Sequence, residues 1–126
     1  MNGENILIDT NIALYLLSGD TVLAEILDSK NVYVSFITEL ELLGFKGITL
    51  DEHQRIENFL KDCIIVDLNE SIKQTTVKLK QRNRIRLPDA IIGATSIYMN
   101  IPLISADSVF QMIDEMQFIM YEKQTE

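Results

Sequence analysis

Short apolar runs alternate with amphipathic segments along this chain, and this alternation is what most limits the folds it can adopt. The runs are rich in residues that favour strands, as expected for strands covered on both faces. They span 5–8 (NILI), 32–35 (VYVS), 64–67 (IIVD) and 102–105 (PLIS), with a further run at 118–121 (FIMY) that would close an edge. Helices between parallel strands cover both faces of a sheet. We therefore predict an α/β fold, a three-layer sandwich with a central, mainly parallel sheet of four to five strands.

Two of the intervening helices have recognisable starts. Thr49 followed by Glu52 forms a capping-box pattern before an amphipathic segment over 50–62. Pro88 suits the first turn of a helix over 88–100, where its missing amide hydrogen is not needed. Helices at these places fit between the strand-like runs.

The length and composition indicate one compact domain. A chain of 126 residues is the usual size of a single domain, so we predict one domain over 1–126. The only cysteine, Cys63, cannot form an internal disulfide, which indicates a reducing compartment and a buried, unreactive thiol. The first nine residues lack a signal-peptide pattern, and no apolar run approaches the roughly 18 residues of a membrane span. We expect a soluble, cytoplasmic protein with no membrane partner.

Two aspartates follow predicted strands. Asp9 comes directly after the first strand, and Asp107 follows the fourth strand with one residue between. Because parallel strands end at the same sheet edge, both carboxylates should lie where open α/β folds bind ligands. Each aspartate has an alternative role as the N-cap of the helix after it, over 10–17 and 108–115.

Two further acids approach this edge from predicted helices. Asp89 lies in the first turn of the apolar helix that Pro88 opens, where it would otherwise only stabilise the positive helix end by roughly 0.3–1 kcal/mol. The segment 35–47 offers Glu39 and Glu41, which point about 160° apart on a helix, so only one can face the site. The expected core stripe of that helix is Ile37, Leu40, Leu43 and Gly44. Both glutamates flank this stripe, and periodicity does not choose between them.

Acids that meet at one sheet edge require a cation. Each like-charge pair at 4 Å costs about 4 kcal/mol at an effective dielectric near 20, and several pairs would rival the stability of a whole domain. Carboxylate ligands match Mg²⁺ or Mn²⁺, which keep waters for a substrate phosphate. Such a site suits phosphodiester hydrolysis.

The charge distribution is uneven. The net charge of −8 argues against a nucleic-acid partner, but residues 71–88 hold six of the eleven basic residues and no acid. Within this stretch, Lys73, Lys80 and Arg84 would share a face if the helix persists, and Arg86 follows just before Asp89. These four side chains are candidates to hold RNA phosphates. The alternative is a solvated helix followed by a basic loop.

Four ordered motifs give the chain a family resemblance. They are LIDTNIALYLL (7–17), VSFITELELLGF (34–45), LPDAIIGATS (87–96) and LISADSVF (103–110). In this order and at these separations they resemble a PIN domain, and most closely the VapC-type toxin ribonucleases. The resemblance covers nearly the whole chain.

The resemblance implies a specific set of site residues. It implies that the catalytic and metal-binding acids are Asp9, Glu41, Asp89 and Asp107, holding one or two Mg²⁺ or Mn²⁺ ions. It selects Glu41, which periodicity alone did not. It also implies that Asn11 and Ser105 support these acids through hydrogen bonds. One departure is Val109, where the family often has another acid, so a single-metal site is an alternative.

The resemblance also implies an activity and partners. It implies a metal-dependent endoribonuclease, the toxin of a type II VapBC-like toxin–antitoxin pair, which forms a homodimer and is inhibited by its antitoxin. From the unpaired negative cluster we predict that the antitoxin places an arginine or lysine among the carboxylates. The alternative is a catalytically degenerate PIN domain that binds RNA or protein. A receiver domain and a haloacid-dehalogenase-type phosphatase fit badly, because Asp9 has no adjacent acid and position 11 is Asn.

Overall fold

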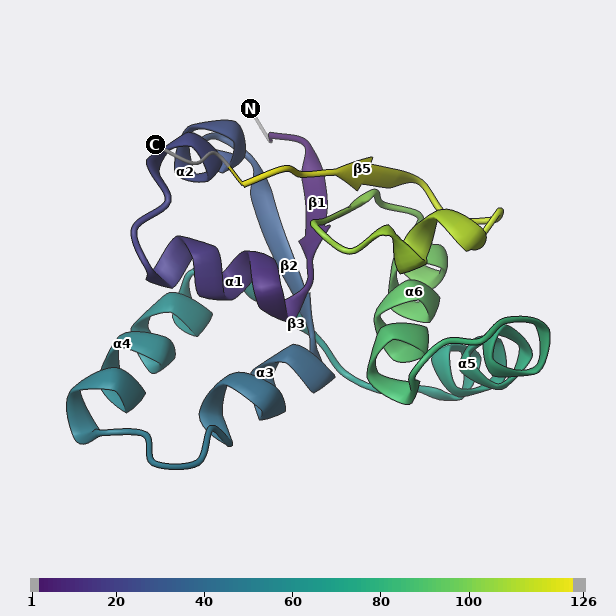
Figure 1. Cartoon of the computed structure of the whole chain (residues 1–126), viewed down its shortest axis with the longest axis horizontal. Coiled ribbons are helices and arrows are strands. Elements are labelled where there is room, and N and C mark those ends of the chain that lie inside the picture. Colours follow the sequence, from purple (N-terminus) through teal and green to yellow (C-terminus); the bar gives the residue numbers. More distant parts are fainter. Residues whose placement is uncertain (1–2, 124–126) are drawn as a thin grey trace.

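The computed structural model describes residues 3–123 and shows an α/β sandwich (Figure 1). Residues 1–2 and 124–126 of the predicted single domain lie outside this range. The elements follow the order β1 (Asn5–Ile8), α1 (Thr10–Leu17), α2 (Thr21–Leu27), β2 (Asn31–Ser35), α3 (Phe36–Leu43), α4 (Leu50–Lys61), β3 (Ile64–Val66), α5 (Glu70–Arg82), α6 (Leu87–Met99), β4 (Leu103–Ser105), the 3₁₀ helix η1 (Ser108–Met112) and β5 (Phe118–Met120).

The sheet of the described residues has five strands in the order β3-β2-β1-β4-β5, and every neighbouring pair is parallel. The predicted fold class is thus confirmed, with the fifth strand present at the edge. Ile8 at the end of β1 lies opposite Val34 of β2 and Ile104 of β4, so these three strands end almost level. The chain runs from β1 toward β3 on one side and places β4 on the other. The gap between β1 and β4 is therefore a topological switch point, where such folds bind ligands.

Two hydrophobic cores form the layers between sheet and helices. Alternation along the strands sends Leu7 and Leu103 into a core with α5, α6 and η1. It sends Ile6, Ile8 and Ile104 into a second core with α1, α2 and α4. In Figure 1 these two helix groups lie on opposite sides of the sheet, with α3 near the end of β2. Because strands buried on both faces cannot present a polar side, the functional side chains gather at the strand ends.

The predicted helix starts are confirmed. Thr49 caps α4, its hydroxyl accepting a hydrogen bond from the Glu52 amide while the Glu52 carboxylate accepts one from the Thr49 amide. Pro88 lies in the first turn of α6, and all residues from Ala90 to Ser96 are buried. The small apolar segment of α6 therefore packs against the sheet, as expected, and brings its first turn to the sheet edge.

The expected core stripe of α3 is only partly correct, because Ile37 and Leu43 pack against the cores but Leu40 and Gly44 are exposed. Leu40 is 57% exposed, while Thr38 and Leu42 are buried. Ser35 ends β2 and caps α3 directly, accepting a hydrogen bond from the Ile37 amide, so the strand sets the rotation of the helix. Because α3 follows β2 without a connecting loop, the end of the strand decides which residues of α3 face inward.

The helix expected over 108–115 is instead the short 3₁₀ helix η1. The buried side chains Phe110, Ile113 and Met116 follow one another at intervals of three residues. This spacing suits a 3₁₀ helix and the tight turn after it, since residues three apart eclipse there. Packing of these three side chains against α6 therefore prevails over α-helical periodicity.

Two further expectations concern Cys63 and membranes. Cys63 is partly rather than fully buried, and burial raises the pKa of its thiol to about 11. Such a thiol is a poor nucleophile at neutral pH. Within residues 3–123, no helix combines the length and the apolar character needed to cross a bilayer.

Candidate active site

The carboxyl edge of the sheet carries a cleft of about 400 Å³ that is lined by acids from four different parts of the chain. Asp9 follows β1, Asp107 follows β4, Glu41 lies on α3 and Asp89 lies in the first turn of α6. The fold thus brings all four predicted acids to one cavity. Among the residues that the structure describes, Arg86 is the only basic side chain that lines it.

Asp9 is the most enclosed of the four acids in the cleft, with only 5% of its surface exposed. Its Oδ1 accepts a hydrogen bond from the Ile12 amide at 2.9 Å and its Oδ2 accepts one from the Ser105 hydroxyl at 2.5 Å. Burial raises the pKa of Asp9, and the charges of Asp89 and Asp107 raise it further. The two hydrogen bonds lower this pKa and only partly offset the rise. Asp9 is therefore both the N-cap of α1 and a member of the cleft, so the two interpretations of this residue are not exclusive.

Ser105 connects two of the acids. The residue is fully buried at the end of β4, and its Oγ accepts a hydrogen bond from the Asp107 amide at 3.0 Å while it donates to Asp9. Asp107 itself is exposed and caps η1, its Oδ1 accepting a hydrogen bond from the Val109 amide at 2.9 Å. One buried hydroxyl thus fixes the relative positions of the strand-end carboxylates.

Glu41 is held by a pair of threonines that sequence reasoning missed. Its Oε1 lies 2.6 Å from the Thr10 hydroxyl, which in turn lies 3.1 Å from the buried Thr38 hydroxyl. A carboxylate only accepts and a hydroxyl has one proton, so Thr10 donates to Glu41 and Thr38 donates to Thr10. Glu39 does not line the cleft. The available sequence signal was the position of Thr10 directly after Asp9.

Asp89 is, after Asp9, the second acid of the cleft whose pKa is raised by its surroundings. Its side chain is 14% exposed and its Oδ2 lies 3.5 Å from Nε of Arg86. Burial raises the pKa of Asp89, the Arg86 guanidinium opposes this rise, and the charges of Asp107 and Glu41 add to it. Since the Arg86 side chain is 79% exposed, solvent weakens this ion pair and leaves the cleft negative.

Asn11 is placed differently from Ser105. It lines the cleft and is exposed. Among residues 3–123, the hydrogen bonds that hold the acids come from Ser105, Thr10 and backbone amides, and not from the Asn11 side chain. Asn11 therefore faces the contents of the cleft rather than bracing its walls.

The basic stretch is only partly organised as expected. The shared helix face holds for Lys73 and Lys80, which both lie on α5, but not for Arg84, because α5 ends at Arg82 and Asn83 is extended. The amide and the side-chain nitrogen of Asn83 both donate to the Leu79 carbonyl and close the helix. Beyond it the chain turns inward to bury Ile85, whose carbonyl accepts a hydrogen bond from Lys80 Nζ at 2.7 Å. The three basic residues are exposed outside the cleft, and Arg86 alone of the predicted set reaches its wall.

The donor set fits a hydrated divalent ion. All four acids offer carboxylate oxygens, which Mg²⁺ and Mn²⁺ prefer, and their charge exceeds that of Arg86. Within the described part of the chain, no three His, Cys, Asp or Glu side chains are drawn together as a ready coordination shell. This open arrangement suits Mg²⁺, which typically binds through one or two carboxylates and retains several waters.

Comparison with known proteins agrees with this architecture. The sequence model of the family described as PIN domain matches residues 6–116. A toxin–antitoxin complex from Klebsiella pneumoniae contains a chain that is 30% identical, with a TM-score of 0.80 over 93% of this chain and 98% of that one. VapBC-1 from nontypeable Haemophilus influenzae is 27% identical, with a TM-score of 0.79 over 92% and 97% of the two chains. VapBC2 from Rickettsia felis, bound to a promoter DNA fragment, shares the fold at 19% identity, with a TM-score of 0.79 over 94% and 99%. No curated protein matches the chain.

Proposed function

Since this chain belongs to the PIN domain family, we propose that it is a metal-dependent endoribonuclease and the toxin of a VapBC-like toxin–antitoxin pair. The observation that carries the proposal is the convergence of Asp9, Glu41, Asp89 and Asp107 on one cleft at the switch point of a parallel sheet. These acids come from four separate elements, so no single helix cap or surface pair accounts for their meeting.

The electrostatics of the cleft support a cation requirement. Burial and neighbouring acids raise the pKa of both Asp9 and Asp89, so their charged forms are under-compensated. Mg²⁺ or Mn²⁺ bound through one or two of the four acids, beside the others, would relieve this repulsion, lower the pKa of a bound water and offset charge on the leaving oxygen. Ser105 and Thr10 keep Asp9 and Glu41 oriented for such binding. Val109 supplies no further carboxylate, which favours a single ion.

The basic residues support an RNA substrate. Arg86 lines the cleft beside Asp89 and is exposed, so its guanidinium can contact a phosphate that approaches the acids. Lys73, Lys80 and Arg84 extend positive charge along α5 and the loop after it. In a chain of net charge −8, this one positive region would guide a polyanion toward the cleft.

The similar structures support an antitoxin partner. Several of them are toxin–antitoxin complexes, and the acidic cleft is complementary to a cationic side chain. We propose that the antitoxin places an arginine or lysine among the acids and competes there with metal and RNA. A homodimer and a cytoplasmic location complete the proposal. The homodimer rests on the family resemblance, and the cytoplasmic location rests on the single cysteine, which cannot form an internal disulfide. Loss of antitoxin affinity in Asp9→Asn, measured by calorimetry, is the expected result, and unchanged affinity would contradict this arrangement.

The nuclease proposal is tested with purified protein and total RNA, with and without Mg²⁺ or Mn²⁺. Wild type should cleave only with the divalent ion, while Asp9→Asn and Asp89→Asn should be inactive. Glu41→Gln and Glu39→Gln form a matched pair, because they differ by two positions on α3 and only Glu41 lines the cleft. Glu41→Gln should abolish most of the RNA cleavage, and Glu39→Gln should reduce it only slightly. Equal cleavage by wild type and all variants would indicate a contaminating nuclease and refute the proposal.

A second candidate function is a degenerate PIN domain that binds RNA or a protein without cutting. The observations that favour it are the lack of a preassembled three-acid metal group in the described chain and the valine at position 109. Mn²⁺ titration followed by electron paramagnetic resonance separates the two functions. Binding that disappears in Asp9→Asn supports the nuclease, whereas no binding to wild type supports the degenerate domain.

A further inference from the structure

The side chain of Phe45 is placed unlike every other phenylalanine of this protein. It is 55% exposed, whereas Phe36, Phe59, Phe110 and Phe118 are buried or partly buried. It lines the acidic cleft and also an adjoining pocket of about 310 Å³. Exposure alone is ordinary for an apolar side chain, but only this ring stands exposed between the acids and a second cavity among residues 3–123.

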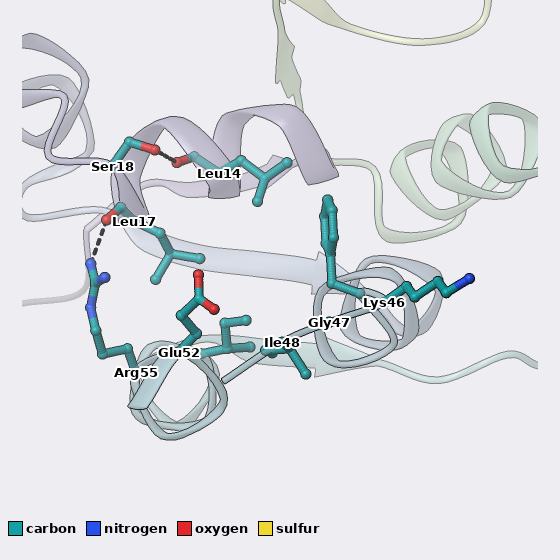
Figure 2. A pocket seen from close by; sticks show the side chains of 10 residues that line it. Leu14, Leu17, Ser18, Lys46, Gly47, Ile48, Glu52 and Arg55 are labelled. Carbon is teal, nitrogen blue, oxygen red and sulfur yellow. Dashed lines mark hydrogen bonds between the residues drawn. The ribbon is translucent and has the colours of Figure 1, made fainter. Parts of the chain in front are cut away.

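The adjoining pocket lies between α1, the 44–49 loop and α4 (Figure 2). Leu14 and Phe45 line both cavities, so the pocket continues the acidic cleft. Leu17 and Ile48 contribute apolar lining, and in Figure 2 the Leu17 side chain points into the pocket while the Lys46 side chain extends away from it. The pocket therefore has a mixed lining, with apolar side chains beside the charged groups of Glu52 and Arg55, and Lys46 carries a positive charge at its outer side.

The walls of this pocket are held by specific contacts. Arg55 on α4 donates a hydrogen bond from Nη2 to the Leu17 carbonyl at 2.6 Å, which joins α4 to the end of α1. The Ile48 amide donates to the Phe45 carbonyl at 3.3 Å, and Gly47 between them has a positive φ of 81°. This turn fixes the backbone that carries the ring, so Phe45 is presented from a defined loop.

We propose that Phe45 is a stacking platform for an RNA base next to the phosphate held at the acids, and that the adjoining pocket receives the following nucleotide. The proposal rests on the proposed ribonuclease function and names its substrate as single-stranded RNA. A strand crossing the cleft would meet the Arg86 guanidinium beside Asp89 and the Phe45 ring beside the pocket. Aromatic rings bind single-stranded RNA by stacking on unpaired bases, which a duplex does not expose.

Stacking also accounts for RNA binding by an acidic protein. With a net charge of −8, phosphate contacts alone must overcome repulsion from the rest of the surface. A base on an aromatic face gains free energy without any charge, and it does so for many sequences. Phe45 thus supplies affinity that the six basic residues of the 71–88 stretch cannot supply alone.

The test measures RNA affinity apart from cleavage. All proteins carry Asp9→Asn to prevent hydrolysis, and the probes are fluorescein-labelled single-stranded oligoadenylate and oligouridylate, followed by anisotropy with Mg²⁺. Phe45→Ala should weaken oligoadenylate binding by about 5- to 100-fold and reduce its advantage over oligouridylate, while Phe45→Trp should restore both. Leu40→Ala is the matched control, since Leu40 is a similarly exposed apolar residue nearby that lines neither cavity.

The salt dependence separates stacking from charge. Phe45→Ala should leave the slope of log affinity against log salt unchanged, whereas Arg86→Met should reduce it. Equal RNA affinity of Phe45→Ala and Leu40→Ala would overturn the proposal. So would a Phe45→Ala variant that binds RNA as before but no longer binds a co-expressed antitoxin. Either result leaves the nuclease proposal intact, because that proposal fails only if cleavage by the otherwise wild-type protein does not depend on Asp9.

Discussion

The hydroxyl of Ser105 offers the sharpest test of how the cleft is held together. It is buried at the end of β4, donates to Asp9 Oδ2 at 2.5 Å and accepts from the Asp107 amide at 3.0 Å. Ser105→Ala removes both hydrogen bonds and leaves the surrounding apolar packing unchanged. We expect this variant to fold and to be less stable than wild type.

The expected loss follows from the two contacts. A hydrogen bond to a charged group contributes about 1.5–3 kcal/mol, and an amide left without its partner adds on the order of 1 kcal/mol. Ser105→Ala should therefore lower the free energy of unfolding by roughly 2–4 kcal/mol near neutral pH. For a chain of this size the melting temperature should fall by about 8–15 °C. Thermal unfolding in metal-free buffer measures the loss.

The pH dependence of this loss identifies its origin. The Ser105 hydrogen bond lowers the pKa of Asp9, which means that it favours the charged carboxylate. Its contribution is therefore present above the pKa of Asp9 and disappears as the pH falls through that value. Because burial raises this pKa above 3.8, the stability difference between wild type and Ser105→Ala should begin to shrink at a pH above 3.8.

Ser35→Ala is the matched control. Ser35 is equally buried at the end of β2, which β1 separates from β4 in the sheet. Its hydroxyl accepts a hydrogen bond from the Ile37 amide rather than holding an acid. Loss of this helix cap should cost about 1 kcal/mol at every pH. If Ser105→Ala and Ser35→Ala were equally destabilised, with no difference in pH dependence, the proposed role of Ser105 in holding Asp9 would be refuted.

Three further predictions concern Asp9, Thr10 and Thr49. Because the pKa of Asp9 is raised in the folded protein, Asp9 contributes to stability below a pH of about 3.8, and this contribution is lost as the pH rises through the pKa of the folded state. Asp9→Asn should therefore weaken the fall of stability with rising pH, and thermal melts should show a more stable metal-free protein at neutral pH. Thr10→Val removes the 2.6 Å hydrogen bond that orients Glu41, so Mn²⁺ affinity should fall roughly tenfold, whereas Thr10→Ser should keep the wild-type affinity. Equal Mn²⁺ affinities of wild type and Thr10→Val in calorimetry would count against this role of Thr10. Thr49→Ala should cost about 1 kcal/mol in denaturant unfolding with no change in Mn²⁺ affinity, since Thr49 caps α4 outside the acidic cleft.

Local patterns predicted much of the fold because they depend on neighbouring residues. The alternation of strand-like and helical runs was sufficient for the α/β class, and the capping box at Thr49 follows from residues three apart. The positions of Asp9 and Asp107 at the sheet edge also follow from local order, because parallel strands end on one side. These inferences required no knowledge of which helix faces which.

By itself, then, the sequence determined the layers of the sandwich, the edge at which carboxylates collect and the uneven charge. Only the tertiary structure decided the rotation of α3, which exposes Leu40, turns Glu41 toward Thr10 and leaves Glu39 outside the cleft. It also decided that α5 stops before Arg84 and that Phe45 stands between two cavities. The physical reason is that the rotation and the end of a helix are set by contacts between distant segments, whose packing outweighs the hydrophobic pattern of any one segment.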